Sequence, residues 1–355
     1  MSFRSSKARY VFVDALRGVA ALGVVLYHVY SKNLLPMSGY RLPEPLHAIC
    51  SNGNLGVYIF FVISGFVITQ SIRGSAITPR FVGWFALRRS LRLDPPYWAT
   101  IAAMIALSYA SGHVQRDHAP LPLPAWGSVV AHLFYLQGLL GYPQIVGVFW
   151  TLCYELQFYL TLVVLAGVWQ QLGSALRSRW LVFGPLWIAS LVCVARSPDP
   201  TQEVVFVYAW PYFFLGVAVN WVHNGEESPR ALAIIAAGTA AVLPFAPLKI
   251  GAALVTAVAI YQVSIAGRLT SLTLGRALQY LGRISYSLYL VHMLVGTPLL
   301  RFALRHLGPV HFTTAVGLTG LAVAVSIAAA HVLYVVIERP AVRWSHRLPL
   351  RSTGR

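Results

Sequence analysis

The stretch RGVAALGVVLYH, residues 17–28, places an arginine and a histidine at the two ends of ten apolar residues. The apolar run indicates a segment that avoids water, yet an ionisable group at the centre of a bilayer costs roughly 3 kcal/mol or more. Where such groups do occur in apolar segments, they face the interior of a helix bundle and mark a functional path. The stretch therefore predicts a buried helix with a chemical role.

The composition extends this interpretation to the whole chain. Of its 355 residues, 57% are hydrophobic and 10% are charged, whereas soluble proteins have about 25% charged residues. The net charge of +17 is carried mainly by basic residues in short loops between apolar segments. That distribution is typical of membrane topology, and it argues against a nucleic-acid partner. We therefore predict an all-α polytopic membrane protein whose surroundings are a lipid bilayer.

At about 20 apolar residues per crossing, the chain predicts ten transmembrane helices. The stretch at 124–141 is too short and too polar, and we expect it to be interfacial or re-entrant. The first segment is expected to be retained rather than cleaved as a signal peptide, since Asp14 and Arg17 interrupt its apolar run. The predicted spans are 11–30, 55–72, 95–111, 148–169, 180–195, 204–222, 231–247, 250–266, 283–300 and 313–337.

The positive-inside rule tests this count. With the N-terminus in the cytoplasm, 19 of the 27 basic residues fall on the cytoplasmic side and seven on the outside, and Arg17 lies within a helix. We therefore predict a bundle of about ten helices with N- and C-termini cytoplasmic. Residues 1–355 form a single membrane domain in this prediction, with a helical core at 10–340 and a basic cytoplasmic tail at 341–355.

The first helix brings three ionisable residues to one side. At 100° per residue, Arg17 and His28 lie within about 20° of one stripe, and Asp14 lies one turn before Arg17. Gly18 and Gly23, with neighbouring alanines, allow another helix to come close. Two interpretations stay open: Asp14 and Arg17 form an ion pair at the membrane boundary, or the three residues belong to a site.

Glu155, in the predicted span 148–169, is expected at a depth similar to that of His28. A histidine and a carboxylate in one layer can form a general base and the group that orients it. We expect His28 to be the base, with Glu155 or Asp14 holding its ring. The alternative is a carboxylate neutralised by Arg17 or hydrogen-bonded to tyrosines.

A third feature is RFVGWFALRRSLRLDPPYW, residues 80–98. Arg89 and Arg92 are spaced i,i+3 and share a helical face, with Arg88 beside them. Pro95 and Pro96 are expected to begin the next helix, where a missing N–H is harmless. Two interpretations of these arginines stay open: they contact lipid phosphates, or they form a docking site for an anionic cofactor.

Two weaker signals concern helix contacts and hydroxyl groups. Ser64 and Gly65 interrupt apolar bulk, and they favour close helix packing or a narrow channel. Tyr289 and His292 are spaced i,i+3, and His292 is expected to be a hydroxyl partner or a supporting group behind the catalytic residues. We expect no metal site.

Taken together, the motifs occur in an order that resembles the acyltransferase family 3 of integral membrane O-acyltransferases. The resemblance implies ten helices and transfer of an acyl group, usually acetyl, from cytoplasmic acyl-CoA to a hydroxyl of a carbohydrate or related acceptor. It also implies that Arg17 and His28 fill the family's essential arginine-to-histidine motif, that Arg89 and Arg92 fill its Arg-x-x-Arg motif, and that Glu155 is its intramembrane glutamate. The matching elements are Arg17 to His28, FFVISGFVIT at 60–69, RRSLRLDPPYW at 88–98, FWTLCYELQFY at 149–159, GRISYSLYLVH at 282–292 and IERP at 337–340.

The predicted function is therefore a membrane O-acyltransferase of the bacterial cytoplasmic membrane. Acetyl-CoA or another acyl-CoA is the donor, and the acceptor is a carbohydrate, a glycolipid or a small hydroxylated molecule. His28 acts either as a general base or as a nucleophile that carries the acyl group. Some relatives append an extracytoplasmic hydrolase-like domain that we do not expect here, which leaves room for a separate extracytoplasmic partner. The alternative is a proton-coupled multi-pass transporter with the same intramembrane His, Arg and Glu, although the chain shows no paired half-repeats.

Overall fold

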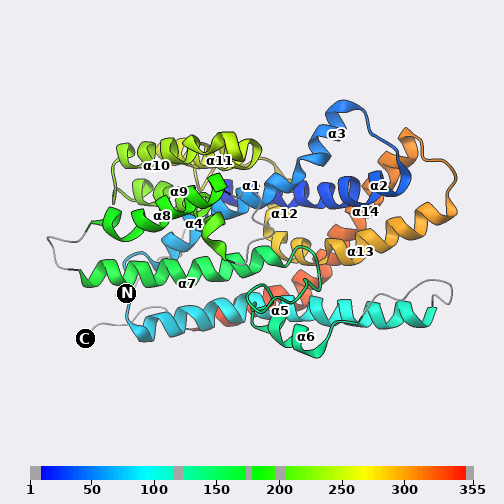
Figure 1. Ribbon diagram of the computed structural model, residues 1–355, viewed down its shortest axis with the longest axis horizontal. Coiled ribbons are helices and arrows are strands. Elements are labelled where there is room, and N and C mark those ends of the chain that lie inside the picture. Colours follow the sequence, from blue (N-terminus) through cyan, green and yellow to red (C-terminus); the bar gives the residue numbers. More distant parts are fainter. Residues whose placement is uncertain (1–8, 115–122, 173–177, 197–204, 349–355) are drawn as a thin grey trace.

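The chain folds into an elongated bundle in which successive long helices run in opposite directions (Figure 1). The computed structural model describes residues 9–114, 123–172, 178–196 and 205–348, and within these ranges every regular element is a helix. The N-terminal third contains α1 (Val11–Leu26), the π-helical η1 (Tyr27–Leu34), α2 (Leu35–Ser38), α3 (Glu44–Ser51), η2 (Gly53–Leu55), α4 (Gly56–Ile72) and α5 (Pro79–Val114).

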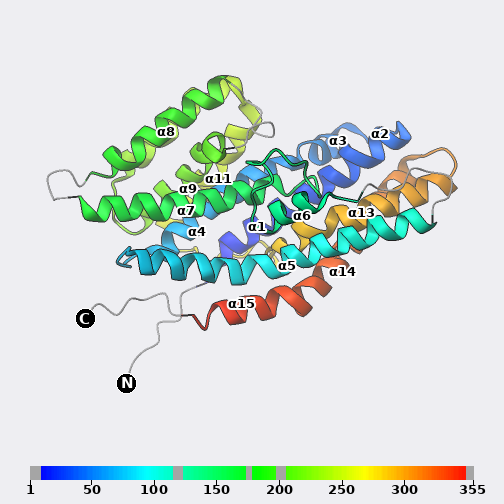
Figure 2. The same cartoon turned by 60° about the horizontal axis from the view of Figure 1, so that its bottom comes forward.

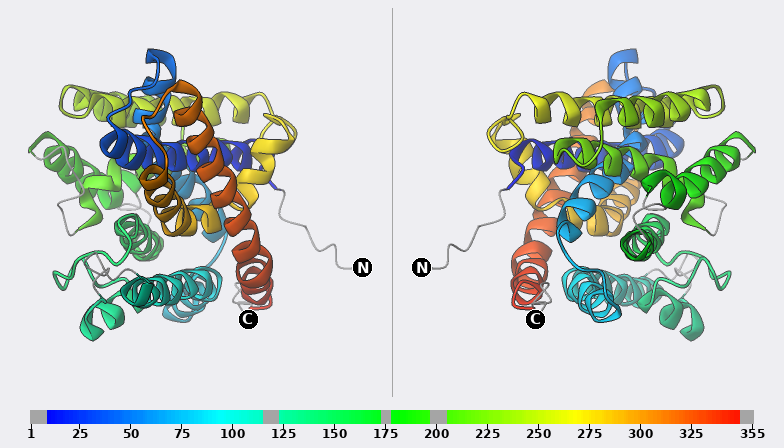
Figure 3. Two further views of the ribbon diagram at one scale, coloured as in Figure 1. Left: turned by 90° about the vertical axis from the view of Figure 1, so that its right-hand side faces the viewer. Right: turned by 90° about the vertical axis from the view of Figure 1, so that its left-hand side faces the viewer.

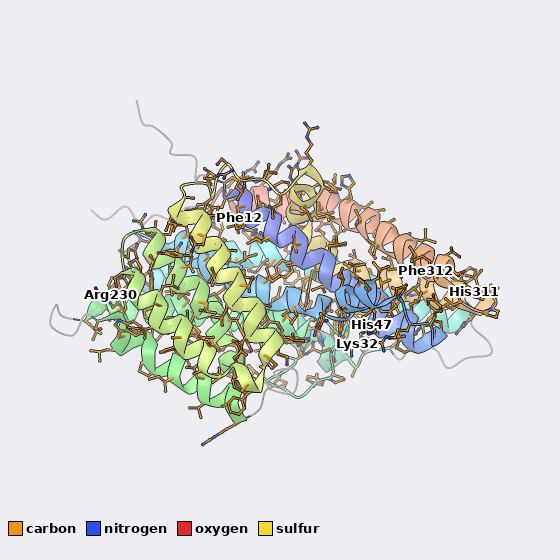
Figure 4. All side chains as sticks on the ribbon, turned by 90° about the horizontal axis from the view of Figure 1, so that it is seen from above. Phe12, Lys32, His47, Arg230, His311 and Phe312 are labelled. Atoms are coloured by element: carbon orange, nitrogen blue, oxygen red, sulfur yellow. The ribbon has the colours of Figure 1, made fainter. Side chains whose placement is uncertain are left out.

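The remaining elements complete the bundle. Phe12 in α1 and Lys32 in η1 mark the course of the first helix, while Arg230 of α10 lies at the opposite end of the molecule from His311 and Phe312 (Figure 4). The described elements that follow α5 are α6 (Trp126–Leu133), α7 (Trp150–Gln171), α8 (Arg179–Arg196), η4 (Phe206–Ala209), α9 (Trp210–His223), α10 (Pro229–Ala241), η5 (Leu243–Phe245), α11 (Pro247–Ile265), α12 (Arg276–Arg283), α13 (Ser285–His306), α14 (Phe312–Leu333), η6 (Tyr334–Glu338) and α15 (Arg339–Ser345).

All ten predicted crossings fall on helices, but they do not all have the character of a membrane span. Among the described residues, seven helical segments are long and apolar enough to cross a bilayer. The other three predictions fall on α9 and α10, which have 14 and 13 residues, and on α5, which is long but less apolar. The protein is therefore a multi-pass integral membrane protein. The stretch at 124–141 contains only the eight-residue α6, followed by turns.

The prediction that Pro95 and Pro96 begin a helix is wrong. Both lie inside α5, which runs unbroken from Pro79. Proline in a helix interior leaves carbonyl groups of the preceding turn without their usual N–H donor, and in membranes neighbouring side chains can supply the missing donors. The Tyr286 hydroxyl donates to the Leu93 carbonyl at 2.8 Å, within this same region. The carbonyl groups that lose a donor are those of Leu91 and Arg92, so this contact joins α13 to α5 beside the proline pair without replacing the missing bonds.

The C-terminal segment also differs from the prediction of a simple basic tail. Its first part is α15, which lies alongside α5 (Figures 2 and 3). Residues 349–355 of the predicted tail lie outside the described residues. The segment 339–345 is thus helical and packs against α5, while its basic residues Arg339 and Arg343 are exposed.

Glycines allow two close helix crossings. A methyl group on Gly18 of α1 would overlap the Leu278 carbonyl of α12, and one on Gly282 would overlap the Asp14 carbonyl. Between α4 and α9, a methyl group on Gly65 would overlap the Phe213 carbonyl, and one on Gly216 would overlap the Val62 carbonyl. The small residues predicted to allow close approach, Gly18 and Gly65, do so. Helices α1 and α4 consequently lie at the centre of the bundle (Figure 3).

We expect Gly216→Ala to destabilise the protein, because the added methyl group would separate α9 from α4. Overpacking of this kind costs about 1–3 kcal/mol, and the measurement is the thermal unfolding midpoint of the detergent-purified protein. Gly83→Ala in α5 is the matched control, since nothing lies within 4 Å of the added methyl group and alanine favours a helix over glycine. Equal midpoints for the two variants would contradict the role of the α4–α9 crossing.

Candidate active site

One cavity of about 100 Å³ lies where six elements converge. It is formed by α1, α4, α5, α7, α13 and η6, so residues far apart in sequence meet there. The polar side chains that line it are Arg17, Ser64, Arg89, Arg92, Thr151, Glu155, Tyr159, Ser285, Tyr286, Tyr289 and Glu338. The structure thus gathers Arg17, Arg89, Arg92, Glu155, Ser64 and Tyr289 of the predicted site residues around one space.

Three arginines give the cavity its charge. Within the described ranges, no carboxylate lies within 4 Å of the guanidinium group of Arg17, Arg89 or Arg92. Arg89 lies over the rings of Phe85 and Tyr159, at 5.4 and 5.2 Å from their centroids, and donates to Ser71 Oγ at 3.3 Å. Two carboxylates against three guanidinium groups leave an excess of positive charge in the cavity.

Arg88 lies elsewhere, although it adjoins Arg89 in sequence. Its Nη2 lies 2.6 Å from Nδ1 of His346, just beyond α15, and Arg88 does not line the cavity. On a helix, consecutive residues point about 100° apart, so Arg89 and Arg92 face the cavity while Arg88 faces α15. The three arginines predicted as one docking group are thus divided between two surfaces.

Glu155 is bound to hydroxyl groups and not to a histidine. Its Oε1 accepts hydrogen bonds from Ser64 Oγ, at 2.7 Å, and from the Tyr159 hydroxyl. The alternative of a carboxylate hydrogen-bonded to tyrosines therefore describes the geometry, and the expected contact between Glu155 and His28 does not occur. Ser64, predicted as a helix-packing or channel residue, is one of the groups that position this carboxylate.

The layers of the bundle explain why Glu155 and His28 do not meet. The Tyr289 hydroxyl lies 2.7 Å from Thr151 Oγ1 and donates to the Val148 carbonyl at 3.0 Å. Thr151 is one turn before Glu155 in α7, whereas His292 is about one turn beyond Tyr289 in α13. Glu155 therefore lies about two turns, or roughly 10 Å, from the level of His292.

His28 forms a pair with His292. Nδ1 of His28 lies 3.2 Å from Nε2 of His292 and 2.9 Å from the Val24 carbonyl, while Nδ1 of His292 lies 3.1 Å from the Leu288 carbonyl. Because a carbonyl oxygen only accepts, both Nδ1 atoms carry the hydrogen in the neutral rings. His28 Nδ1–H therefore points to Val24 and His292, and its Nε2 keeps a free lone pair.

The backbone around His28 is unusual. The α-helix ends at Leu26, and His28 is the second residue of the π-helical η1. Such segments occur mostly as short insertions and frequently at functional sites. Asn33 Nδ2 donates to the His28 carbonyl at 2.5 Å, so a buried side chain adds a hydrogen bond to the backbone at this position. The sequence predicted the position of His28 but not this π-helical setting.

Asp14 is not placed to hold His28. Its Oδ2 lies 2.5 Å from Nε of Arg9, which precedes the helix. The expected ion pair between Asp14 and Arg17 is likewise absent from the ion pairs of the described residues, because Arg17 faces the cavity. The prediction that Asp14 orients the histidine is therefore wrong in its geometry, and His292 occupies that place.

Glu338 is a cavity residue to which the sequence interpretation gave no role. It is 5% exposed, and its Oε2 accepts from Ser287 N at 3.2 Å and from Ser287 Oγ at 2.5 Å. The available signal was a carboxylate at the end of a long apolar helix, within the IERP motif. Such a group is costly to bury unless it is hydrogen-bonded, as it is here.

The cavity has cationic groups, and about two turns away, outside its lining, lies the histidine pair with one free basic nitrogen. The model of the acyltransferase 3 family, described as an acyltransferase domain, matches residues 10–331. The chain belongs to the acyltransferase 3 family. It is an acyltransferase, and the predictions of family and enzyme class are confirmed. Family membership also favours the enzyme over the transporter.

Similar proteins agree with this family. A protein named Acyltransferase MdmB, from Streptomyces mycarofaciens, is 27% identical over 93% of this acyltransferase and 91% of its own length. Nodulation protein 10 of Rhizobium leguminosarum bv. viciae is 30% identical over 50% of this chain and 47% of its own. No solved structure matches the chain. In the described part of this acyltransferase, no three His, Cys, Asp or Glu side chains are grouped so as to hold a metal ion.

Proposed function

We propose that this acyltransferase transfers an acyl group, most simply acetyl, from cytoplasmic acyl-CoA to a hydroxyl of a carbohydrate-type acceptor in the cell envelope or among secreted molecules. The acceptor class includes glycolipids and small hydroxylated molecules. The proposal includes ten crossings of the bacterial cytoplasmic membrane, both termini in the cytoplasm, and one domain. A separate extracytoplasmic partner that completes the reaction is compatible with it.

One observation carries the proposal: three half-buried arginines line a single cavity without an ion-pair partner among the described residues. Glu155 and Glu338 leave one positive charge in excess there, and an anionic ligand would offset the cost of holding that charge away from water. Guanidinium groups bind phosphate through two parallel hydrogen bonds. The phosphates of coenzyme A have the matching charge and geometry.

The spacing along α1 supports the same donor. Arg17 and His28 are eleven residues apart, or about 16 Å along a helix, which an extended pantetheine arm can bridge. With its phosphates among the arginines, the donor would present the thioester near His28. Nε2 of His28 would then accept the proton of the acceptor hydroxyl as the hydroxyl oxygen attacks the thioester carbonyl carbon. The C–S bond would break, and the proton would pass from His28 to the departing coenzyme A thiolate. The same nitrogen would be the nucleophile in the acyl-histidine variant.

The direct test is the release of coenzyme A by the detergent-purified protein, given acetyl-CoA and a panel of sugars, glycolipids and hydroxylated metabolites. Release that depends on one acceptor class, together with its O-acetylation by mass spectrometry, is the expected result. Absence of both CoA binding and release with every acceptor would oppose the acyl-CoA donor. A comparison of O-acetyl content in surface glycans of a deletion strain would identify the acceptor.

In this mechanism His292 is a positioning residue, so its replacement should slow catalysis more than it weakens donor binding. We expect His292→Leu to lower kcat by about 10- to 100-fold with little change in the KM for acyl-CoA, because the loss of one hydrogen bond releases the His28 ring. His292→Gln keeps an acceptor near the position of Nε2 and should recover much of the activity. Equal activities of the Leu and Gln variants, with equal folded yield, would contradict this role.

A further inference from the structure

Ser285 is the first residue of α13. Its hydroxyl group has no hydrogen-bond partner in the described chain, whereas the hydroxyl groups of two nearby serines have one. Ser285 lines the cavity and is 1% exposed, yet its Oγ has no hydrogen-bond partner in the described chain. By contrast, Ser64 Oγ donates to Glu155 and Ser287 Oγ donates to Glu338. Buried hydroxyl groups are nearly always hydrogen-bonded. The exception at Ser285 therefore points to a partner that enters the cavity from outside the chain.

The surroundings of Ser285 indicate the charge of that partner. The first amides of a helix have no acceptor within it, and the helix dipole places partial positive charge at this end. Of the amides in the first turn of α13, that of Ser287 already donates to a carboxylate, Glu338. Arg17 and Arg92 line the same cavity. The hydroxyl, the helix N-terminus and two guanidinium groups together favour an anion with several acceptor oxygens.

The position along α13 narrows the choice among the anionic groups of coenzyme A. Ser285 and His292 are seven residues apart on one helix, or about 10 Å. The pyrophosphate is the first anionic group met along the donor from its thioester, and the 3′-phosphate lies beyond it on the ribose. A pantetheine arm that can bridge the longer separation of Arg17 and His28 covers this 10 Å when it is bent. With the thioester at the histidine pair, the pyrophosphate then lies between the levels of Ser285 and Arg17.

We propose that Ser285 Oγ, the first turn of α13, Arg17 and Arg92 form a subsite for the pyrophosphate of the acyl-CoA donor. This inference rests on the proposed function, since it specifies how that donor is held. In the subsite, Ser285 donates its hydroxyl hydrogen to a pyrophosphate oxygen, while Glu338 stays bound to Ser287 and keeps α13 in place. No bond is made or broken, and the contribution is to binding.

The test measures binding of three probes to the detergent-purified full chain by calorimetry: coenzyme A, dephospho-CoA and pantetheine. Dephospho-CoA keeps the pyrophosphate but lacks the 3′-phosphate, and pantetheine lacks both. We expect Ser285→Ala to weaken coenzyme A and dephospho-CoA by the same factor, about tenfold, and to leave pantetheine binding unchanged. Ser326→Ala is the matched control, because Ser326 is equally buried in α14 but donates to the Ala322 carbonyl outside the cavity.

Three results would overturn the inference. Unchanged binding of coenzyme A to Ser285→Ala would show that the hydroxyl does not contact the donor. An equal loss for pantetheine would place the contact on the arm, and a loss for coenzyme A without one for dephospho-CoA would place it on the 3′-phosphate. Failure of the unmodified protein to bind coenzyme A would instead refute the proposed donor itself, so the two failures are distinguishable. Thermal unfolding of each variant separates lost binding from lost folding.

Discussion

Replacement of His28 with alanine is expected to lower the rate of acyl transfer by about 10²- to 10⁴-fold, the usual contribution of a general acid or base. The free Nε2 of His28 is the basic nitrogen of the histidine pair, and His292 cannot replace it because its own Nε2 faces His28. The measurement is the initial rate of acceptor-dependent release of coenzyme A at saturating acetyl-CoA. Binding of coenzyme A should remain, since His28 does not line the cavity.

His306→Ala provides the control for this experiment. His306 lies in the same helix as His292 and has the same type of contact, Nδ1 at 2.8 Å from the Phe302 carbonyl, but it is exposed. A folded His28→Ala protein with the unmodified rate would refute the assignment. Rapid quenching with labelled acyl donor distinguishes the two chemical roles, because only a nucleophilic His28 would leave a protein-bound acyl group.

The second large effect is expected at the arginines of α5. Arg92→Ala should raise the KM for acyl-CoA by about 10- to 100-fold, because it removes a charge-assisted hydrogen-bond donor from the half-buried cavity. Arg88→Ala should change the KM by less than about threefold, since Arg88 does not line the cavity and instead contacts His346 at an exposed position. The kinetic constants of both variants, measured with acetyl-CoA, give the comparison.

The comparison of Arg88→Ala with Arg92→Ala tests the arrangement seen in the structure, because the two residues are four positions apart in one basic cluster but face different surfaces. Contact with lipid phosphates or a general electrostatic attraction would make the two substitutions similar. Similar values of KM for Arg88→Ala and Arg92→Ala would therefore contradict a docking site made by one face of α5. Folded yield in detergent is the control for both.

The sequence sufficed for features that depend on local pattern. Apolar segments predicted the positions of the helices, and the small residues around Gly18 and Gly65 predicted that other helices come close there. Arg17, Arg89 and Arg92 were found because a charged residue in or beside an apolar segment is conspicuous. The continuous course of α5 through Pro95 and Pro96 was missed, because proline is most common at the start of a helix, whereas membrane helices also tolerate it in their interior.

Features that depend on the relative heights of helices could not be obtained from sequence. Glu155 and His28 looked level when each was counted from its own predicted membrane boundary. Helix α7 in fact begins at Trp150, and its Thr151 meets Tyr289, which places Glu155 below the histidines. The partnership of His28 with His292, separated by 264 positions in the chain, arises from that same vertical alignment.

The crossing of Gly18 with α12 has a consequence for motion in this enzyme. Just beyond α12, the chain continues as α13, so α1 is locked to the α12–α13 segment by backbone contact near Arg17 and by the histidine pair near its other end. Sliding or tilting α1 against α13 would break both attachments together. Helices α1 and α13 are therefore coupled at two levels of the bundle, and we expect them to move as one unit when donor or acceptor enters.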